Sequence, residues 1–354
     1  MQSKEKQKVI IIGAGSFGTC LAIHLARLGH QVFLWSYETS IAEGINKNHR
    51  NPQFLSNVVI PDNVSAFSGE DLLLQHLSGS AVVLATPTQW LRAVLEKIKY
   101  PLKDANFIVS VVKGLEIGTE CFPSQIVGQV VGEDVLEKLA VLSGPSFAIE
   151  VAEGQPTGVS AGSRNLAIAK HAQELFHSPQ FRVYTSNDPV GLEVAGALKN
   201  VIALASGACS GLGFQNNSRA ALITRGLAEI TRIGVALGAN PLTFKGLGGV
   251  GDLFLTCSSE KSRNFTVGYR LGKGERLDEV LRTLGSVAEG VATAKAAYSL
   301  VQRLGVRAPI ITVVYEVLSQ KKPLKNAAEE LTHADARHEL EFDVTLGLPQ
   351  QKTS

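Results

Sequence analysis

Short runs of apolar residues alternate with longer helical patterns along the first half of the chain. Residues 9–12 and 31–35 are apolar runs typical of buried strands, and residues 19–28 between them repeat apolar positions at helical spacing up to Gly29. Further strands are predicted at 81–85, 107–112, 139–142, 157–160 and 181–184, and further helices through Trp90, Val94 and Ile98 and at 167–176. This alternation predicts a mostly parallel sheet with helices on both faces.

The pattern changes near residue 187, where the strand-like runs end. Asp188 is a favourable helix N-cap, and Pro189 suits the first helical position after it. Helical spacing then continues over 189–208, 217–238, 242–248, 263–273, 277–284, 288–303, 309–319 and 323–331. We therefore predict an α/β fold of two domains, with a Rossmann-type doubly wound sheet in residues 1–187 and an all-α domain in residues 188–354. The cleft between two such domains is the expected place for an active site.

A glycine motif stands where the first predicted strand meets the first predicted helix. It has the form G-x-G-x-x-G and reads Gly13-Ala14-Gly15-Ser16-Phe17-Gly18. Gly13 permits the tight turn, Gly15 lets the backbone approach a pyrophosphate, and Gly18 lets helix and strand pack closely. The free N–H groups of the helix start favour the phosphates. The motif predicts dinucleotide binding, with a purely structural glycine-rich turn as the alternative.

The residues after the second predicted strand bear on the choice of cofactor. An acid that would bind the adenosine ribose is expected about 20 residues beyond the glycines, but Tyr37 falls near that position and Glu38 follows it. Tyr37 could stack on an adenine, and Arg50 could reach a 2′-phosphate. We therefore expect NADP, as NADPH, to be preferred and NAD to be accepted. The alternative for Tyr37 is an ordinary half-exposed aromatic side chain.

Composition narrows the classes of partner. The 354 residues carry a net charge of only +2, which gives no reason to expect a nucleic acid or an acidic membrane surface. No uninterrupted run of 18 apolar residues occurs, so no membrane insertion is expected. The four cysteines are far apart, so neither a metal site nor a disulfide framework is predicted, and reduced thiols favour a cytoplasmic protein.

Lys199 is the strongest candidate for chemistry in the second half. Its neighbours on the predicted helix are small, and they are Ala195, Gly196, Ala203 and Ser206. A lysine on such a face has room above it for a ligand, and partial burial would lower the pKa of its ammonium so that it could donate a proton. The alternative is an exposed lysine on a helix whose small residues serve packing alone.

Several polar groups are predicted to lie near Lys199 at the sheet edge. The carboxyl ends of parallel strands face ligands, and this places the loops 86–88, 113–114 and 143–146 together. Lys113 ends one strand, and the loop after another carries Gly144 and Ser146. The alternative for each is a solvated strand end.

Two further stretches of the second half carry candidate ligand contacts. A glycine-rich run from Gly246 lacks the Lys-Ser/Thr ending of a P-loop and leads to Asp252, which could hold a substrate hydroxyl or orient Lys199. Ser262-Arg263-Asn264 precedes a predicted helix, where an arginine and a helix start together suit a phosphate. The alternative for these residues is a helix cap or a solvated loop.

Taken in order, these blocks closely resemble the bacterial NAD(P)-dependent glycerol-3-phosphate dehydrogenase family over residues 8–340. The matching blocks are 13–19, 112–114, 144–148, 199–200, 217–226, 248–252, 262–264 and 287–290. The resemblance implies hydride transfer between NAD(P)H and dihydroxyacetone phosphate, which yields sn-glycerol 3-phosphate for phospholipid synthesis, in a homodimer. Val112 departs from the pattern, because many members have Ser before the Lys-Gly pair.

The resemblance also implies residue roles by position. Lys199 matches the proton donor and acceptor. Positions that contact the phosphorylated substrate are matched by Lys113, Gly144, Ser146, Lys199, Asp252, Ser262, Arg263 and Asn264. Cofactor-contacting positions are matched by Ser16, Phe17, Lys113, Ala148, Arg263 and Glu289, with Val287 and Tyr37 as further candidates beside the three glycines.

Two alternatives remain open at this point. Another two-domain dehydrogenase, of the hydroxyacid or 6-phosphogluconate type, would share the nucleotide half and differ around Lys199 and Arg263. A non-catalytic NADP-binding sensor would keep the glycine turn but would have no reason to keep Lys199, Asp252 and Arg263 facing one cleft. Substrate profiling separates the first from the family, and NADPH binding without oxidation would favour the second.

Overall fold

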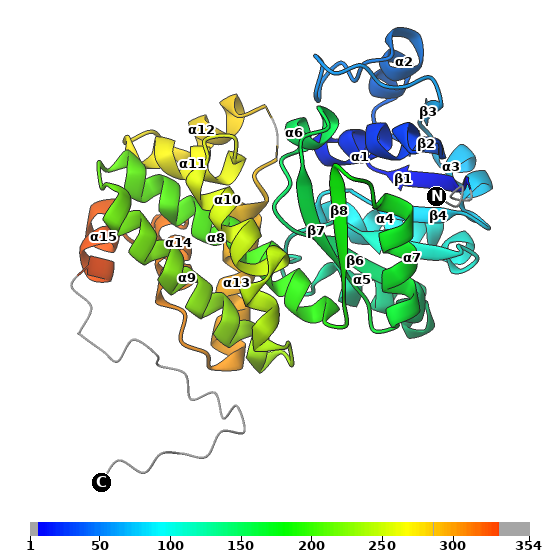
Figure 1. The fold of residues 1–354 in the computed structure, drawn as a ribbon. Coiled ribbons are helices and arrows are strands. Elements are labelled where there is room, and N and C mark those ends of the chain that lie inside the picture. Colours follow the sequence, from blue (N-terminus) through cyan, green and yellow to red (C-terminus); the bar gives the residue numbers. More distant parts are fainter. Residues whose placement is uncertain (1–5, 286, 333–354) are drawn as a thin grey trace.

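The structure, a computed structural model, describes residues 6–285 and 287–332, which form a sheet half and a helical half side by side (Figure 1). The strands are β1 Lys8–Ile12, β2 Gln31–Trp35, β3 Val64–Phe67, β4 Ala81–Leu84, β5 Phe107–Ser110, β6 Leu139–Ser143, β7 Thr157–Gly162 and β8 Phe181–Ser186. They form one sheet in the order β3-β2-β1-β4-β5-β6-β7-β8, and only the β6–β7 pairing is antiparallel. The predicted doubly wound, mostly parallel sheet is confirmed.

Helices cover both faces of this sheet. They are α1 Ser16–Arg27, α2 Thr39–Asn48, α3 Glu70–Leu77, α4 Thr88–Lys103, α5 Pro123–Val131, α6 Ala148–Ala152 and α7 Leu166–Phe176, with a 3₁₀ turn at Glu133–Lys138. Val9 and Ile11 of β1 belong to one buried cluster, and Ile10 and Ile12 belong to another. Successive side chains of a strand point to opposite faces, so β1 is apolar throughout because both faces are covered.

The second half is helical, as predicted. Its helices are α8 Pro189–Gly211, α9 Asn216–Ala236, α10 Asp252–Ser258, α11 Arg263–Gly272, α12 Leu277–Thr283, α13 Glu289–Leu304, α14 Pro309–Leu318 and α15 Leu324–Thr332. The sequence patterns did not predict α10, and the helix that they predicted at 242–248 is wrong. A 3₁₀ turn at Pro241–Lys245 and a π turn at Leu247–Gly251 replace it, because Gly246 is extended (φ −92°, ψ −169°) and interrupts the helical path.

Helix α8 is the central helix of this half. Asp188 caps it as predicted, since its Oδ1 accepts a hydrogen bond from the Gly191 amide at 2.9 Å. By length and composition α8 could cross a membrane, but 89% of its most apolar window is buried within the structure. It is therefore the core helix of a folded domain, which is consistent with a soluble protein.

Close glycine contacts set the crossing of α8 with α11. A Cβ added at Gly207 would lie 2.0 Å from the Phe265 carbonyl oxygen, and one added at Gly268 would lie 1.9 Å from that of Leu204. Any side chain at these two positions would force the helices apart. Their close approach holds the first residues of α11 against α8, and this placement matters for the site described next.

Candidate active site

A carboxylate at the start of α10 joins two lysines from distant parts of the chain. Lys199 Nζ on α8 donates to Asp252 Oδ1 at 2.5 Å, and Lys113 Nζ after β5 donates to Asp252 Oδ2 at 2.7 Å. Lys113 also donates to the Gly144 carbonyl at 3.3 Å. The structure thus brings together four residues that the sequence predicted, from both halves of the chain.

Lys199 is buried, with only 8% of its surface exposed, so the alternative of an exposed helix lysine is wrong. Burial lowers the pKa of its ammonium to about 8; the Asp252 carboxylate partly opposes this shift, and the Lys113 charge adds to it. A lysine in this condition holds a proton at neutral pH and can release it readily.

Thr256 is a site residue that sequence reasoning missed. Its hydroxyl accepts from Lys199 Nζ at 2.8 Å and donates to the Asp252 carbonyl at 2.7 Å, one turn earlier in α10. Residues four apart lie on one face of a helix. The signal was therefore present in the spacing of Asp252 and Thr256, but it could be used only if residues 252–258 were recognised as a helix.

The small residues on one face of α8 allow the sheet edge to pack closely against this helix. A Cβ added at Gly196, one turn before Lys199, would lie 3.0 Å from Ser143 Oγ and 3.5 Å from Lys113 Cγ. The packing role considered above is therefore real at Gly196. It also supports the chemical role, because this contact brings Lys113 and the end of β6 next to Lys199.

The loops predicted to share the sheet edge do lie together. A Cβ added at Gly114 would lie 2.4 Å from Thr88 Oγ1 and 3.2 Å from Glu289 Oε2. The Thr88 amide donates to Glu289 Oε1 at 3.1 Å, which ties the start of α4 to the start of α13. Burial raises the pKa of the Glu289 carboxyl, and the hydrogen bond from Thr88 counters part of that shift.

The start of α11 forms the adjacent part of the site. Arg263 is exposed at its first position, and its charge interacts with that of Glu289. Asn264 Oδ1 accepts from the Gly290 amide at 2.9 Å. Ser262 Oγ accepts from the Phe265 amide at 3.3 Å. Ser262 therefore caps α11, as the alternative interpretation of this residue as a helix cap predicted. Ser146 Oγ, across the sheet edge, donates to the Gly144 carbonyl at 3.0 Å.

The glycine turn has the shape that a dinucleotide needs. Gly13 has φ +118°, and a Cβ there would lie 2.7 Å from the Ala85 carbonyl oxygen, while a Cβ at Gly18 would lie 1.9 Å from that of Gly13. At Gly15, by contrast, an added Cβ would meet nothing within 4 Å. Gly15 caps α1 without any side-chain hydrogen bond, so room and an uncapped helix start coincide where a pyrophosphate would bind.

The remaining cofactor candidates lie around this turn or on the surface. Phe17 and Ala148 pack against the buried cluster beneath the sheet. Tyr37 is 80% exposed and Val287 is 49% exposed. Among the described residues, no hydrogen bond links either of them to Lys113 or Lys199. Arg50 donates to the Ser56 carbonyl at 3.1 Å. The part of the chain that the structure describes contains no group of three His, Cys, Asp or Glu suited to a metal ion.

A separate apolar cavity of about 330 Å³ lies within the helical half, between α8, α9, α14 and α15. Leu204, Cys209, Arg225, Val314 and Leu331 are among its lining residues. None of the predicted site residues lines it, so the candidate active site is the polar group around Asp252 and not this cavity.

Sequence comparisons match the chain along both halves. Residues 8–169 match the family model "NAD-dependent glycerol-3-phosphate dehydrogenase N-terminus", and residues 188–329 match the corresponding C-terminus model. A glycerol-3-phosphate dehydrogenase [NAD(P)+] of Enterococcus faecalis is 45% identical over 337 residues, which cover 95% of this chain and 98% of the relative. The enzyme of the same name from Geobacillus kaustophilus is 48% identical over 337 residues, which cover 95% of this chain and 97% of that relative.

Solved structures agree with the sequence comparisons. The crystal structure of glycerol-3-phosphate dehydrogenase from Coxiella burnetii superposes with a TM-score of 0.87 at 34% identity, covering 93% of this chain and 99% of that one. A D-mandelate dehydrogenase with NADH superposes with a TM-score of 0.60 at 15% identity, over 91% of this chain and 99% of that one, and shares the fold alone.

Proposed function

This chain belongs to the NAD-dependent glycerol-3-phosphate dehydrogenase family, and we propose that Lys199 is the general acid and base of its reaction. The enzyme is an oxidoreductase that reduces dihydroxyacetone phosphate to glycerol 3-phosphate with NAD(P)H. Membership of this family decides against the other two-domain dehydrogenases and the non-catalytic sensor. The observation that carries the proposed role is the Asp252 carboxylate, which holds Lys199 and Lys113 side by side.

Lys199 supplies the proton that reduction of a ketone requires. A bound reduced nicotinamide supplies the hydride to the carbonyl carbon. As the carbonyl oxygen gains negative charge, the Lys199 ammonium donates its proton to that oxygen and becomes a neutral amine, which regains a proton from solvent. Asp252 and Thr256 accept hydrogen bonds from Lys199 Nζ and so hold the ammonium in one orientation. In the reverse direction the neutral amine accepts the alcohol proton.

The surrounding cations suit a phosphorylated substrate. Lys113 and Lys199 share one carboxylate, so the pair retains a net positive charge, and Arg263 adds a guanidinium at the start of α11. An arginine at a helix N-terminus is a strong phosphate ligand. Arg263 therefore binds the phosphate. The other proposed substrate contacts are Lys113, Gly144, Ser146, Asp252, Ser262 and Asn264.

The sheet half binds the cofactor and the helical half completes the substrate site. This division follows the two proposed domains, 1–187 and 188–354, of which residues 333–354 lie outside the described part. The cofactor contacts proposed are Gly13, Gly15, Ser16, Phe17, Gly18, Tyr37, Lys113, Ala148, Arg263, Val287 and Glu289. A preference for NADPH completes the proposal and rests on the missing ribose acid near Tyr37 and on Arg50. A cytoplasmic location rests on the four widely spaced cysteines, whereas a homodimer and a role in phospholipid synthesis rest on the family resemblance.

Oxidation of NADPH by the purified protein tests the proposed reaction. Adding dihydroxyacetone phosphate should cause a rapid fall in NADPH absorbance, whereas unphosphorylated dihydroxyacetone should react far more slowly, because it lacks the group that Arg263 binds. Equal rates with both ketones would remove the phosphate site from the proposal. Replacing NADPH with NADH in the same assay measures the cofactor preference.

The pH dependence of the rate reports on Lys199 directly. Because reduction needs the protonated lysine, kcat for reduction should be highest below about pH 8 and should fall as pH rises through the lysine pKa of about 8. Oxidation of glycerol 3-phosphate needs the neutral amine, so its kcat should rise over the same range. Profiles of kcat in both directions check this, and inflections near the ordinary lysine value of 10.5 would contradict the effect of burial.

A further inference from the structure

The loop of residues 113–122, here named the junction loop, joins the two halves of the molecule. Its first residue, Lys113, reaches Asp252 at the start of α10. Leu115 and Phe122 belong to the buried cluster of the helical half, although they lie between elements of the sheet half. Glu120 Oε2 accepts from Arg303 Nε of α13 at 2.9 Å. The loop that carries Lys113 is therefore packed into the opposite half.

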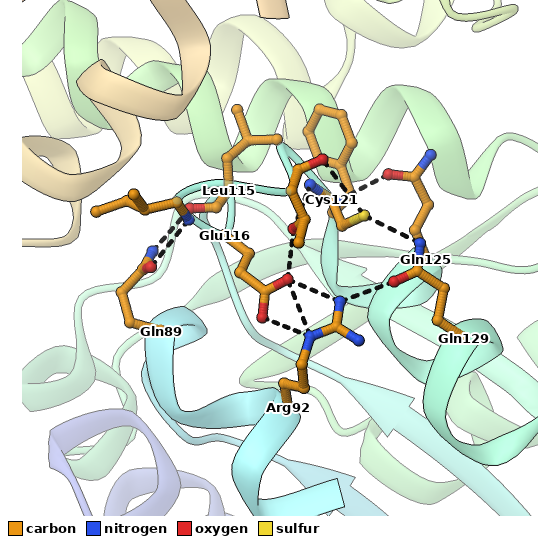
Figure 2. Close-up of polar contacts among 10 residues, drawn as sticks. Gln89, Arg92, Leu115, Glu116, Cys121, Gln125 and Gln129 are labelled. Carbon is orange, nitrogen blue, oxygen red and sulfur yellow. Dashed lines mark hydrogen bonds and ion pairs between the residues drawn. The ribbon is translucent and has the colours of Figure 1, made fainter. Parts of the chain in front are cut away.

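Helix α4 holds the same loop from the sheet side (Figure 2). Arg92 Nε donates to both Glu116 oxygens at 2.9 and 3.1 Å, and Arg92 Nη2 donates to Oε2 at 2.7 Å. Arg92 Nη2 also donates to Gln129 Oε1 of α5 at 2.7 Å. One turn earlier, Gln89 accepts from the Ile117 amide at 3.0 Å and donates to the Leu115 carbonyl at 2.7 Å. Two side chains of α4 thus form hydrogen bonds with three consecutive loop residues, 115–117.

The Glu116 carboxylate is the centre around which the loop folds. The Thr119 hydroxyl donates to it, and the Glu116 amide donates to the Cys121 carbonyl at 3.0 Å, which closes the loop. Glu116 is 8% exposed. Burial alone would raise the pKa of its carboxyl, but the hydrogen bonds from Arg92 and Thr119 outweigh burial and hold the pKa below its usual value. The carboxylate thus stays charged and paired.

We propose that Arg92, Gln89 and Glu116 are positioning residues that hold Lys113 where the substrate binds. Lys113 lies three residues before Glu116, and none of the hydrogen bonds that Arg92 and Gln89 make with the loop involves Lys113 itself. If the loop contacted only the helical half, its backbone could move with that half relative to the sheet. The hydrogen bonds from Arg92 and Gln89 of α4 instead fix the loop backbone relative to the sheet edge. The same helix begins at Thr88, which binds Glu289, so α4 sets two parts of the site at once. This inference rests on the substrate-binding role proposed for Lys113.

The test separates positioning from stability with two variants. Arg92→Ala should raise the KM for dihydroxyacetone phosphate about tenfold while kcat changes less than about threefold, because small displacements of binding groups have large effects. It should also lower the melting temperature, since it leaves the buried Glu116 carboxylate without its charged partner. Arg92→Met combined with Glu116→Gln removes both charges at similar volume, so the melting temperature should recover while the KM stays raised.

Each control excludes one other explanation. Lys99→Ala removes an exposed ion pair with Glu96 on the same helix and should behave as the unchanged enzyme. Recovery of both KM and melting temperature in the double variant would overturn the inference, because the pair would then be structural only. If Arg92→Ala does not fold, the double variant alone still decides between a raised and a normal KM. Lys113→Ala with a normal KM would instead refute the proposed role of Lys113.

Discussion

Lys199→Ala is expected to lower kcat for reduction of dihydroxyacetone phosphate by about 10²–10⁴-fold, the usual contribution of general acid–base catalysis. Binding of NADPH should be retained, because the glycine turn and α1 lie in the other half and do not depend on Lys199. Steady-state kinetics at saturating NADPH and a fluorescence titration of NADPH measure the two quantities. Near-normal turnover would remove Lys199 as the proton donor.

Two further measurements make this test specific to the proton. Lys199→Arg keeps the positive charge beside Asp252 but cannot release a proton at physiological pH, so its kcat should also be low in both directions. A small primary amine added to Lys199→Ala should restore part of the activity, since it can enter the space left by the side chain and donate a proton. Full activity of Lys199→Arg would show that the charge, and not the proton, is what the reaction uses.

Arg263→Ala is expected to raise the KM for dihydroxyacetone phosphate by about 10²-fold with a much smaller change in kcat. A hydrogen bond to a charged group contributes about 1.5–3 kcal/mol, which corresponds to about 10- to 150-fold in binding. The effect falls on KM because the phosphate is bound equally in the ground state and the transition state. Steady-state kinetics at saturating NADPH check this.

The matched control is another arginine of the same helix. Arg270 lies two turns further along α11 and pairs with Glu275, so Arg270→Ala should leave the KM unchanged. With NADPH saturating, unphosphorylated dihydroxyacetone provides a second control. Weaker cofactor binding is then compensated, so the slow reduction of this ketone should be unaffected by Arg263→Ala. An equal loss of activity with both ketones would mean that Arg263 acts on the cofactor or on the fold and not on the phosphate.

Much of this architecture was predictable from local patterns. The β1 strand, the glycine turn and α1 follow from apolar spacing and from three glycines within six residues, and α8 begins where Asp188 and Pro189 predict it. These features depend on neighbours in sequence, because helix and strand periodicity and helix caps are short-range effects. The same spacing placed small residues beside Lys199, and the packing role considered there as the alternative occurs at Gly196, which contacts the sheet edge.

Local patterns failed where glycines break the helical period. The segment from Pro241 to Gly251 passes through a 3₁₀ turn and then a π turn, and the predicted helix at 242–248 does not form. Its glycines pack against backbone: a Cβ added at Gly249 would lie 2.3 Å from the Phe244 carbonyl oxygen. Apolar spacing carries no information about such contacts, and this is why α10 and the role of Thr256 were missed.

Sequence alone was enough to indicate a nucleotide-binding sheet, a helical second half and the candidate residues of the site. The arrangement of those residues is a property of the folded chain. Lys113, Lys199 and Asp252 are separated by 53 to 139 positions and meet only because the junction loop and the packing of α10 against α8 bring their elements together. The pKa of Lys199 likewise depends on burial and on two charges that are distant in sequence. Periodicity records which face of an element is apolar, whereas packing in three dimensions determines which polar groups share the interior.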